Sequence, residues 1–179
     1  MKRIVQALAA LAVVMTAAVA GAAEPKIEVG KPAPPFKLRP LKGEVLDRDG
    51  LRGQVVVVNI WATWCGPCRA EFLEFERYQK ARGKYGLTII AVEQGGAPAS
   101  GPMRKLAEVV SFPVVLSHRA RAPAYLAIDG KVPSNYVIDR AGRVRYAKSG
   151  AFTLTELDEV VRPLLNEPAP ADVTAALAE

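Results

Sequence analysis

The sequence predicts an α/β domain with a mixed central sheet flanked by helices, together with a short N-terminal β extension. Runs of apolar, mostly β-branched residues at Val55–Trp61 and Leu87–Val92 indicate two buried strands. Between them, Phe72, Phe75 and Tyr78 recur at helical spacing and are separated by charged residues. A strand, a helix and a strand within about 40 residues form a parallel βαβ unit.

The first 23 residues have the composition of a secretory signal peptide. Lys2 and Arg3 precede an apolar stretch, Ile4–Ala20, which ends in small residues suited to cleavage. A retained membrane anchor is the alternative, because the stretch approaches the length of a spanning helix. Either interpretation places the folded part outside the cytoplasmic membrane, in the periplasm, where disulfides persist.

Length and charge limit the remaining possibilities. The chain has 179 residues and a net charge of +6. This length suffices for one domain, which we place at residues 24–166, followed by a flexible tail rich in Pro and Ala at residues 167–179. The basic residues are scattered rather than gathered with aromatic residues, so we expect no nucleic-acid binding. We expect a monomer.

The other elements follow in order along the chain. Glu24–Arg39 is rich in proline and should be extended, with short strands at Phe36–Leu38 and Glu44–Leu46 that form the β extension. The first helix should run from Cys68 to Lys84. Beyond the second buried strand we expect a helix at Pro102–Val110, an extended piece at Phe112–Leu116, and a short helix at Arg119–Ala127 that is interrupted near Pro123. A hairpin of Ser134–Ile138 and Val144–Ala147 and a last helix that begins with a capping box at Thr153 should follow.

The only two cysteines, Cys65 and Cys68, lie in the sequence Trp-Cys-Gly-Pro-Cys between the first buried strand and the first helix. Two thiols at this spacing, at a strand-to-helix turn, form a dithiol/disulfide redox switch. Cys65 precedes the helix, whose free N–H groups and dipole favour a thiolate, so it should attack. Cys65 should be exposed at the turn, whereas Cys68 should face the domain and resolve the mixed disulfide. Pro67 suits the first helical turn, and Gly66 lets a partner chain approach.

Two other uses of the cysteine pair are less favoured. A structural disulfide at this spacing closes almost no loop and would add little stability. A zinc site needs four ligands, and besides the cysteines only His118 and scattered carboxylates are available. We expect neither a metal ion nor a cofactor. His118 itself should be a surface loop residue.

The segment Val55–Glu71, VVVVNIWATWCGPCRAE, resembles the thioredoxin superfamily, and within it the extracytoplasmic TlpA/ResA/DsbE-type branch. Further matching segments are Val29–Phe36, Phe112–Leu116 and Val132–Arg143, so the resemblance covers about residues 28–165. It implies a thioredoxin-like fold and a thiol-disulfide oxidoreductase.

The resemblance also implies a substrate-binding region. Pro133 matches the proline that is cis in this family and packs beside the active disulfide, and Val132 before it would offer backbone groups to an incoming peptide. From the residues alone, an ordinary edge-strand proline is the favoured interpretation of Pro133. We assign substrate contacts to these two residues and to Trp64, Gly66 and Pro67.

Two polar positions near the cysteines bear on proton transfer. Asn59 stands six residues before Cys65, where cytoplasmic thioredoxins carry a buried Asp, and an amide does not titrate. Glu71, one helical turn after Cys68, is expected to tune the acidity of the thiols and to shuttle a proton. A solvated helix carboxylate is the alternative for Glu71. Glu93 is a weaker candidate for the same work.

The Cys-Gly-Pro-Cys sequence resembles that of reducing thioredoxins, so we expect a reductase of protein disulfides that receives electrons from a membrane thiol-relay protein. The usual targets in this family are the cysteine pairs of apocytochrome c and the cysteines of copper-site assembly proteins. Two alternatives are a thiol peroxidase, which usually needs Thr where Ala62 stands, and a Cu(I)-binding metallochaperone that uses Cys65 and Cys68 but lacks a nearby His or Met.

Overall fold

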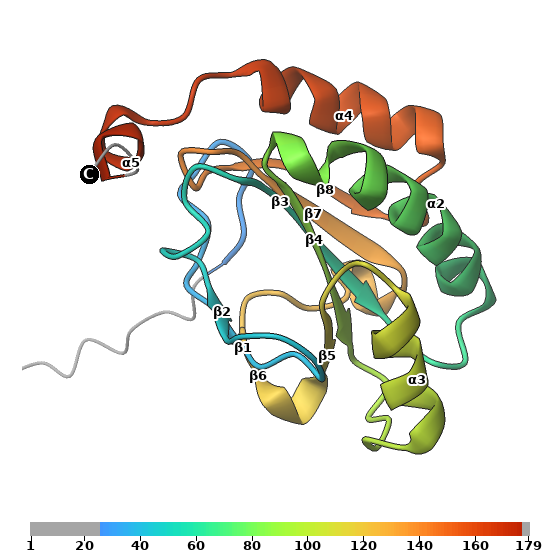
Figure 1. The fold of residues 1–179 in the computed structure, drawn as a ribbon. Coiled ribbons are helices and arrows are strands. Elements are labelled where there is room, and N and C mark those ends of the chain that lie inside the picture. Colours follow the sequence, from blue (N-terminus) through green and yellow to red (C-terminus); the bar gives the residue numbers. More distant parts are fainter. Residues whose placement is uncertain (1–25, 177–179) are drawn as a thin grey trace, which may run out of the picture.

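The computed structural model of the chain describes residues 26–176 (Figure 1). The expected signal peptide or anchor, residues 1–23, lies outside the described residues. Among the helices of residues 26–176, none combines the length and the apolar character that a membrane span requires.

Five strands form the central sheet, in the order β5-β4-β3-β7-β8 (Figure 1). Strand β3 is parallel to β4, and β4 is parallel to β5, whereas β7 runs antiparallel to both β3 and β8. The sheet is therefore mixed, as the sequence predicts. The strands are β3 (Val55–Trp61), β4 (Leu87–Glu93), β5 (Val114–Leu116), β7 (Ser134–Ile138) and β8 (Val144–Ser149).

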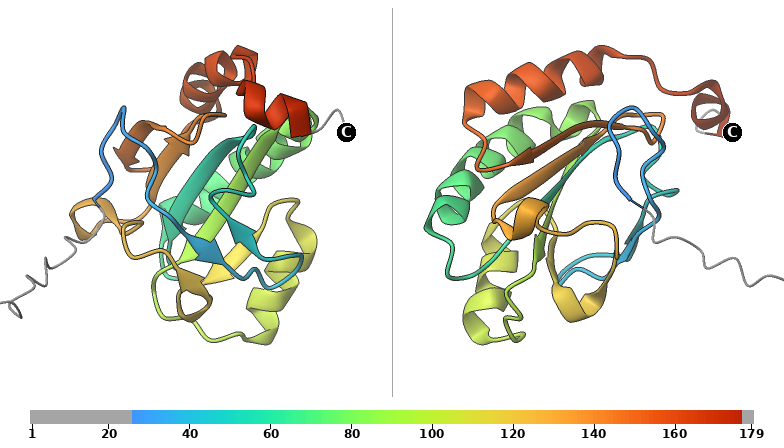
Figure 2. Two further views of the ribbon diagram at one scale, coloured as in Figure 1. Left: turned by 90° about the vertical axis from the view of Figure 1, so that its left-hand side faces the viewer. Right: turned by 180° about the vertical axis from the view of Figure 1, so that it is seen from behind.

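Three helices cover one face of this sheet (Figures 1 and 2). Side chains alternate along β3, so Val55 and Val57 pack beneath the helices, while Val56 and Val58 belong to the core on the opposite face. Asn59 continues the series of Val57 and therefore faces the helices. These helices are α2 (Gly66–Arg82), α3 (Gly101–Val109) and α4 (Leu154–Asn166).

The opposite face is covered by the N-terminal part of the chain and by the loop before β7. Strands β1 (Lys37–Leu38), β2 (Leu46–Asp47) and β6 (Ala120–Arg121) form a small antiparallel sheet in the order β2-β1-β6. Phe36 meets Tyr125 edge to face, with 5.4 Å between ring centroids, within this second core. The predicted β extension is confirmed, and its second strand begins two residues later and ends one residue later than predicted.

The predicted short helix at Arg119–Ala127 is wrong. A 3₁₀ turn, η2 (Ser117–Arg119), leads into β6, and the backbone of β6 pairs with β1 instead of coiling. Pro123 has no N–H with which to continue a helix. The Tyr125 side chain enters the second core, where its hydroxyl donates a hydrogen bond to the carbonyl oxygen of Pro34 (3.0 Å). Burial of the Tyr125 ring, on the sheet face opposite the helices, favours this non-helical conformation of residues 120–127.

The ends of the main helices agree with the sequence to within about two residues. Helix α2 is followed by a 3₁₀ turn, η1 (Gly83–Tyr85), and by Gly86, whose φ of 89° suits a glycine. The capping box of α4 is confirmed. Thr153 Oγ1 accepts from the backbone N–H of Glu156 (3.2 Å), and the Glu156 carboxylate accepts from the backbone N–H of Thr153 (3.0 Å).

The segment that we expected to be a flexible tail contains a short helix, α5 (Ala171–Ala176). Arg52 Nη2 pairs with Asp172 Oδ2 at 2.8 Å. Val173 lies so close to Gly53 that a Cβ on this glycine would be 2.7 Å from Val173 Cγ1. Helix α5 therefore contacts the turn that precedes β3, a long-range contact that local composition does not reveal.

Candidate active site

The cysteine turn joins the end of β3 to the first turn of α2. The backbone N–H of Cys65 donates to the carbonyl oxygen of Ala62 (3.0 Å), which closes the turn, and Pro67 occupies the first turn of the helix. Cys65 is the N-cap residue of α2. Its Sγ accepts a hydrogen bond from the backbone N–H of Cys68 (3.2 Å). A sulfur at this position is stabilised as an anion when the disulfide opens.

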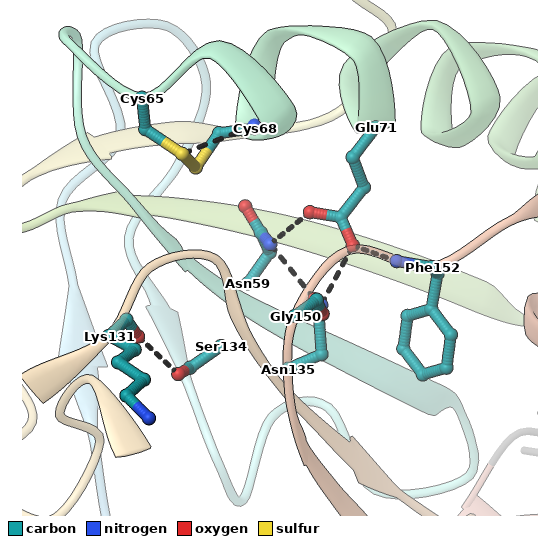
Figure 3. Close-up of a disulfide and its surroundings, with 9 residues drawn as sticks. All are labelled: Asn59, Cys65, Cys68, Glu71, Lys131, Ser134, Asn135, Gly150 and Phe152. Atoms are coloured by element: carbon teal, nitrogen blue, oxygen red, sulfur yellow. Dashed lines mark hydrogen bonds between the residues drawn. A yellow bond between two sulfur atoms is a disulfide. The ribbon is translucent and has the colours of Figure 1, made fainter. Parts of the chain in front are cut away.

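Cys65 and Cys68 form a disulfide beneath the turn (Figure 3). Cys65 is 3% exposed and Cys68 is 0% exposed. Our expectation of an exposed Cys65 is therefore wrong, because the capping geometry turns its sulfur inward. Trp64 is 72% exposed, and Gly66 and Pro67 are exposed as well. These three residues form the exposed surface of the cysteine turn, and their contact with a substrate stays a prediction.

The predicted cis proline is confirmed, since the Val132–Pro133 peptide bond is cis. It follows a 3₁₀ turn, η3 (Ile128–Gly130), and directly precedes β7. Ser134, the first residue of β7, pairs with Ile60 near the end of β3. Pro133 therefore lies at the same end of the sheet as the cysteine turn. Its substrate contact stays a prediction.

Glu71 projects from α2 into a buried polar cluster (Figure 3). It is 1% exposed, and its carboxylate accepts from Asn59 Nδ2 (2.9 Å), Asn135 Nδ2 (2.7 Å) and the backbone N–H of Phe152 (2.6 Å). Burial raises the pKa of Glu71 to about 7, against the opposing effect of these hydrogen bonds and of the Lys148 charge. The alternative of a solvated helix carboxylate is excluded. A carboxyl group with this pKa can take up or release a proton near neutral pH.

Sequence reasoning missed Asn135. It lies directly opposite Asn59 in the antiparallel register of β7 and β3, and its Oδ1 accepts from Asn59 Nδ2 at 2.8 Å. The available signal was an asparagine inside each of two predicted strands, since an amide at a buried strand position needs a partner. Buried amides at such positions need partners, and these two find each other and Glu71.

Glu93 takes no part in the bonds of that cluster. It is buried, and its carboxylate accepts from the backbone N–H groups of Gly95 (2.7 Å) and Ala97 (3.0 Å) in the loop after β4. A Cβ on Gly95 would lie 2.6 Å from the nearer carboxylate oxygen, so a larger residue there would have to displace the Glu93 carboxylate. These contacts indicate that Glu93 shapes a loop. His118 is exposed in η2, as predicted.

Comparisons with known proteins give the same fold and chemistry. The sequence model of the AhpC/TSA family matches residues 29–147. Thioredoxin-like protein YneN of Bacillus subtilis is 30% identical over 74% of this chain and 78% of its own length. Thiol-disulfide oxidoreductase ResA of Geobacillus kaustophilus is 30% identical over 76% of this chain and 80% of its own length.

Among solved structures, the putative thiol:disulfide interchange protein DsbE from Chlorobium tepidum is similar, with a TM-score of 0.65 and 26% identity. The similarity covers 79% of this chain and all of that one. Its fold supports the thioredoxin-like fold that the sequence predicts, and the named relatives support the predicted enzyme class. The chain therefore belongs to the AhpC/TSA family, as a thiol-disulfide oxidoreductase with a thioredoxin-like fold.

Proposed function

We propose that the protein reduces disulfides of protein substrates outside the cytoplasmic membrane. The observation that carries this proposal is the placement of the Cys65–Cys68 disulfide at the N-terminus of α2, beside a buried Glu71 whose pKa is near neutrality. A cysteine pair at a helix N-terminus exchanges disulfides through its thiolate. A carboxyl group that titrates near the working pH suits the proton transfers that accompany exchange.

The proposed reaction proceeds in two exchange steps. The Cys65 thiolate attacks one sulfur of a substrate disulfide, which forms a mixed disulfide and releases a substrate thiolate that takes up a proton. Cys68 then loses its proton and attacks the Sγ of Cys65, which releases the second substrate thiol. Two electrons pass to the substrate, and the protein is left with its Cys65–Cys68 disulfide.

We place the substrate polypeptide across the exposed residues of the cysteine turn and the cis-proline segment. The high exposure of Trp64, together with that of Gly66 and Pro67, supports the first half of this placement. The position of Val132 and Pro133 at the same end of the sheet supports a substrate contact with the cis-proline segment. The contacts of these five residues with the substrate belong to the proposal.

The partners follow from the direction of electron flow. A reductase has to be returned to its dithiol form, and we assign that step to a thiol-relay protein of the membrane. Apocytochrome c cysteine pairs, or the cysteines of copper-site assembly proteins, are the proposed substrates, and the protein acts as a periplasmic monomer. The similarity to thiol-disulfide oxidoreductase ResA and to the putative interchange protein DsbE supports protein disulfides as the substrates.

The two alternative functions lack supporting geometry. Ala62, which stands where a thiol peroxidase usually carries Thr, is buried and offers no hydroxyl group. For the Cu(I)-binding alternative, residues 26–176 bring together no group of three or more His, Cys, Asp or Glu side chains suited to a metal ion.

The direction of the reaction can be tested by the reduction potential of the Cys65–Cys68 couple. We expect a value nearer to about −270 mV, as in thioredoxin, than to about −120 mV, as in a strong oxidase. The measurement is the equilibrium between the protein and mixtures of reduced and oxidised glutathione, followed by the thiol content of each form. A value at the oxidising end would replace the reductase by an oxidase or isomerase.

A further inference from the structure

The side-chain amide of Asn59 is used at only one of its two ends. Its Nδ2 donates to Glu71 Oε2 (2.9 Å) and to Asn135 Oδ1 (2.8 Å). Its Oδ1 is fully buried and accepts from no donor in the described part of the chain. A buried amide oxygen without a hydrogen-bond donor lowers the stability of the fold. The side-chain polar atoms of Glu71 and Asn135 in the same cluster all have partners, so this one oxygen needs an explanation.

The unused oxygen faces the redox centre. In Figure 3 the oxygen of Asn59 points up from β3 toward the Cys65–Cys68 disulfide, while the nitrogen points away toward Glu71 and Asn135. A disulfide has no proton to donate, but a thiol has one. The oxygen therefore lacks a donor in the oxidised protein and faces a donor once the disulfide is reduced.

The cluster holds the amide in this orientation. If Asn59 turned over, its oxygen would face Glu71 Oε2 and Asn135 Oδ1, which would place three acceptors together. Asn135 is fixed in turn, because its Nδ2 donates to Glu71 Oε1 (2.7 Å) and to the carbonyl oxygen of Gly150 (3.2 Å). The two asparagines and the carboxylate thus keep the oxygen aimed at the sulfur atoms.

Of the two sulfur atoms, that of Cys68 is the natural donor. Cys65 is the N-cap residue, whose sulfur faces the helix N–H groups and is favoured as a thiolate. Cys68 lies on the domain side, fully buried, in the direction of Asn59. We propose that Asn59 is a positioning residue for the resolving thiol, whose S–H donates a hydrogen bond to Asn59 Oδ1 in the reduced protein.

This proposal rests on the proposed function, in which Cys65 attacks and Cys68 resolves. The hydrogen bond stabilises the Cys68 thiol against its thiolate, so the two cysteines of one motif are pushed toward different protonation states. The charged group in contact with Asn59 is Glu71 on α2. Lys148 on β8 acts on Glu71 through its charge, and its ammonium group pairs with Glu156 at 2.7 Å. Glu93 on β4 turns its carboxylate to the loop after that strand.

The test uses the Cys65→Ala variant, in which Cys68 is the only thiol. We expect Asn59→Leu in this background to lower the pKa of Cys68 by about 0.5 to 1 unit, because a neutral hydrogen bond to the thiol is lost. The matched control is Asn135→Leu. Each substitution removes one N–H donor from Glu71, but only Asn59→Leu removes the oxygen that faces the sulfur. Equal pKa shifts in the two variants would overturn the proposal.

A second measurement needs no change at Asn59. In Cys65→Ala the S–H stretching band belongs to Cys68 alone, and infrared absorption should place it below the band of a free thiol such as glutathione. A band at the free-thiol position would overturn the proposal even if Asn59→Leu does not fold. A failure of the proposed function looks different, because disulfide reduction by Cys65→Ala would refute the roles of the cysteines while the S–H band stayed shifted.

Discussion

Substitution of Cys65 by Ala is expected to reduce the rate of disulfide reduction to that of the protein-free reaction, whereas Cys68→Ala is expected to stop after one attack. The reason is geometric. Cys65 caps α2, where its sulfur receives the Cys68 backbone N–H at 3.2 Å and the field of the helix N-terminus, and so forms the thiolate. Without Cys68 no second thiol can release the substrate, and a mixed disulfide accumulates.

The measurement is the release of a coloured thiol from a small aromatic disulfide by the pre-reduced proteins. Cys68→Ala should release one equivalent and carry the other half of the disulfide, which mass spectrometry detects on Cys65. Neither variant can form the Cys65–Cys68 disulfide, so the stability of each is compared with that of reduced wild-type protein, which also lacks it. Turnover by Cys65→Ala, or an adduct on Cys68 of the wild-type protein, would show that the nucleophile is wrongly assigned.

The second large effect concerns the pH dependence of stability through Glu71. Its pKa is about 7 in the folded protein and about 4.5 in the unfolded chain, so the folded protein holds the extra proton between these values. The free energy of unfolding should therefore fall as the pH rises from about 4.5 to 7. The contribution of this one group is about 3 kcal/mol, from about 1.4 kcal/mol for each pKa unit. Glu71→Gln should lack this fall.

Denaturant unfolding of the oxidised proteins from pH 4 to 8 measures this effect, because no thiol titrates in the oxidised form. Gln places an N–H₂ group against Asn59 Nδ2, which adds a cost that does not depend on pH, so the slope and not the absolute stability is diagnostic. In the reduced proteins, removal of the Glu71 charge should also lower the pKa values of the two thiols by about one unit. Titration of the thiolate absorbance with pH measures these pKa values in wild type and Glu71→Gln.

Glu74→Gln is the matched control, one turn further along α2. Glu74 pairs with exposed Arg77 at 3.3 Å on the outside of the helix, so its loss should leave the pH slope and the thiol titration unchanged. Parallel stability curves for wild type and Glu71→Gln across the whole pH range would contradict a buried, proton-binding Glu71. Proton transfer in the exchange reaction would then fall to water.

The sequence predicted those parts of the fold whose signals are local. The β-branched run Val55–Trp61 needs burial on both faces, and the structure gives it a helix layer on one side and the N-terminal extension on the other. The Thr153 capping box sets the start of α4 from two side chains alone. The redox pair is equally local, since four consecutive residues define it, and the flanking strand and helix patterns place it at a turn.

What the sequence did not predict depends on contacts between distant residues. The burial of Glu71 follows from Asn135 and Phe152, which are 64 and 81 residues away along the chain. Apart from Pro123, the Arg119–Ala127 segment has helix-compatible composition, yet β1 and the second core determine its conformation. The inward turn of Cys65 depends on the cap it makes, which spacing alone does not specify.

The central claim is that Cys65 attacks the disulfide of an exported protein. The most direct test is to express Cys68→Ser in the native host, to block free thiols with acid and an alkylating agent, and to identify what is bound to the protein through a disulfide. The account predicts a covalent complex in which Cys65 is joined to one cysteine of an exported protein that carries a cysteine pair, and no such complex for the Cys65→Ser/Cys68→Ser double variant. Recovery of Cys68→Ser with Cys65 alkylated and no bound protein would contradict it.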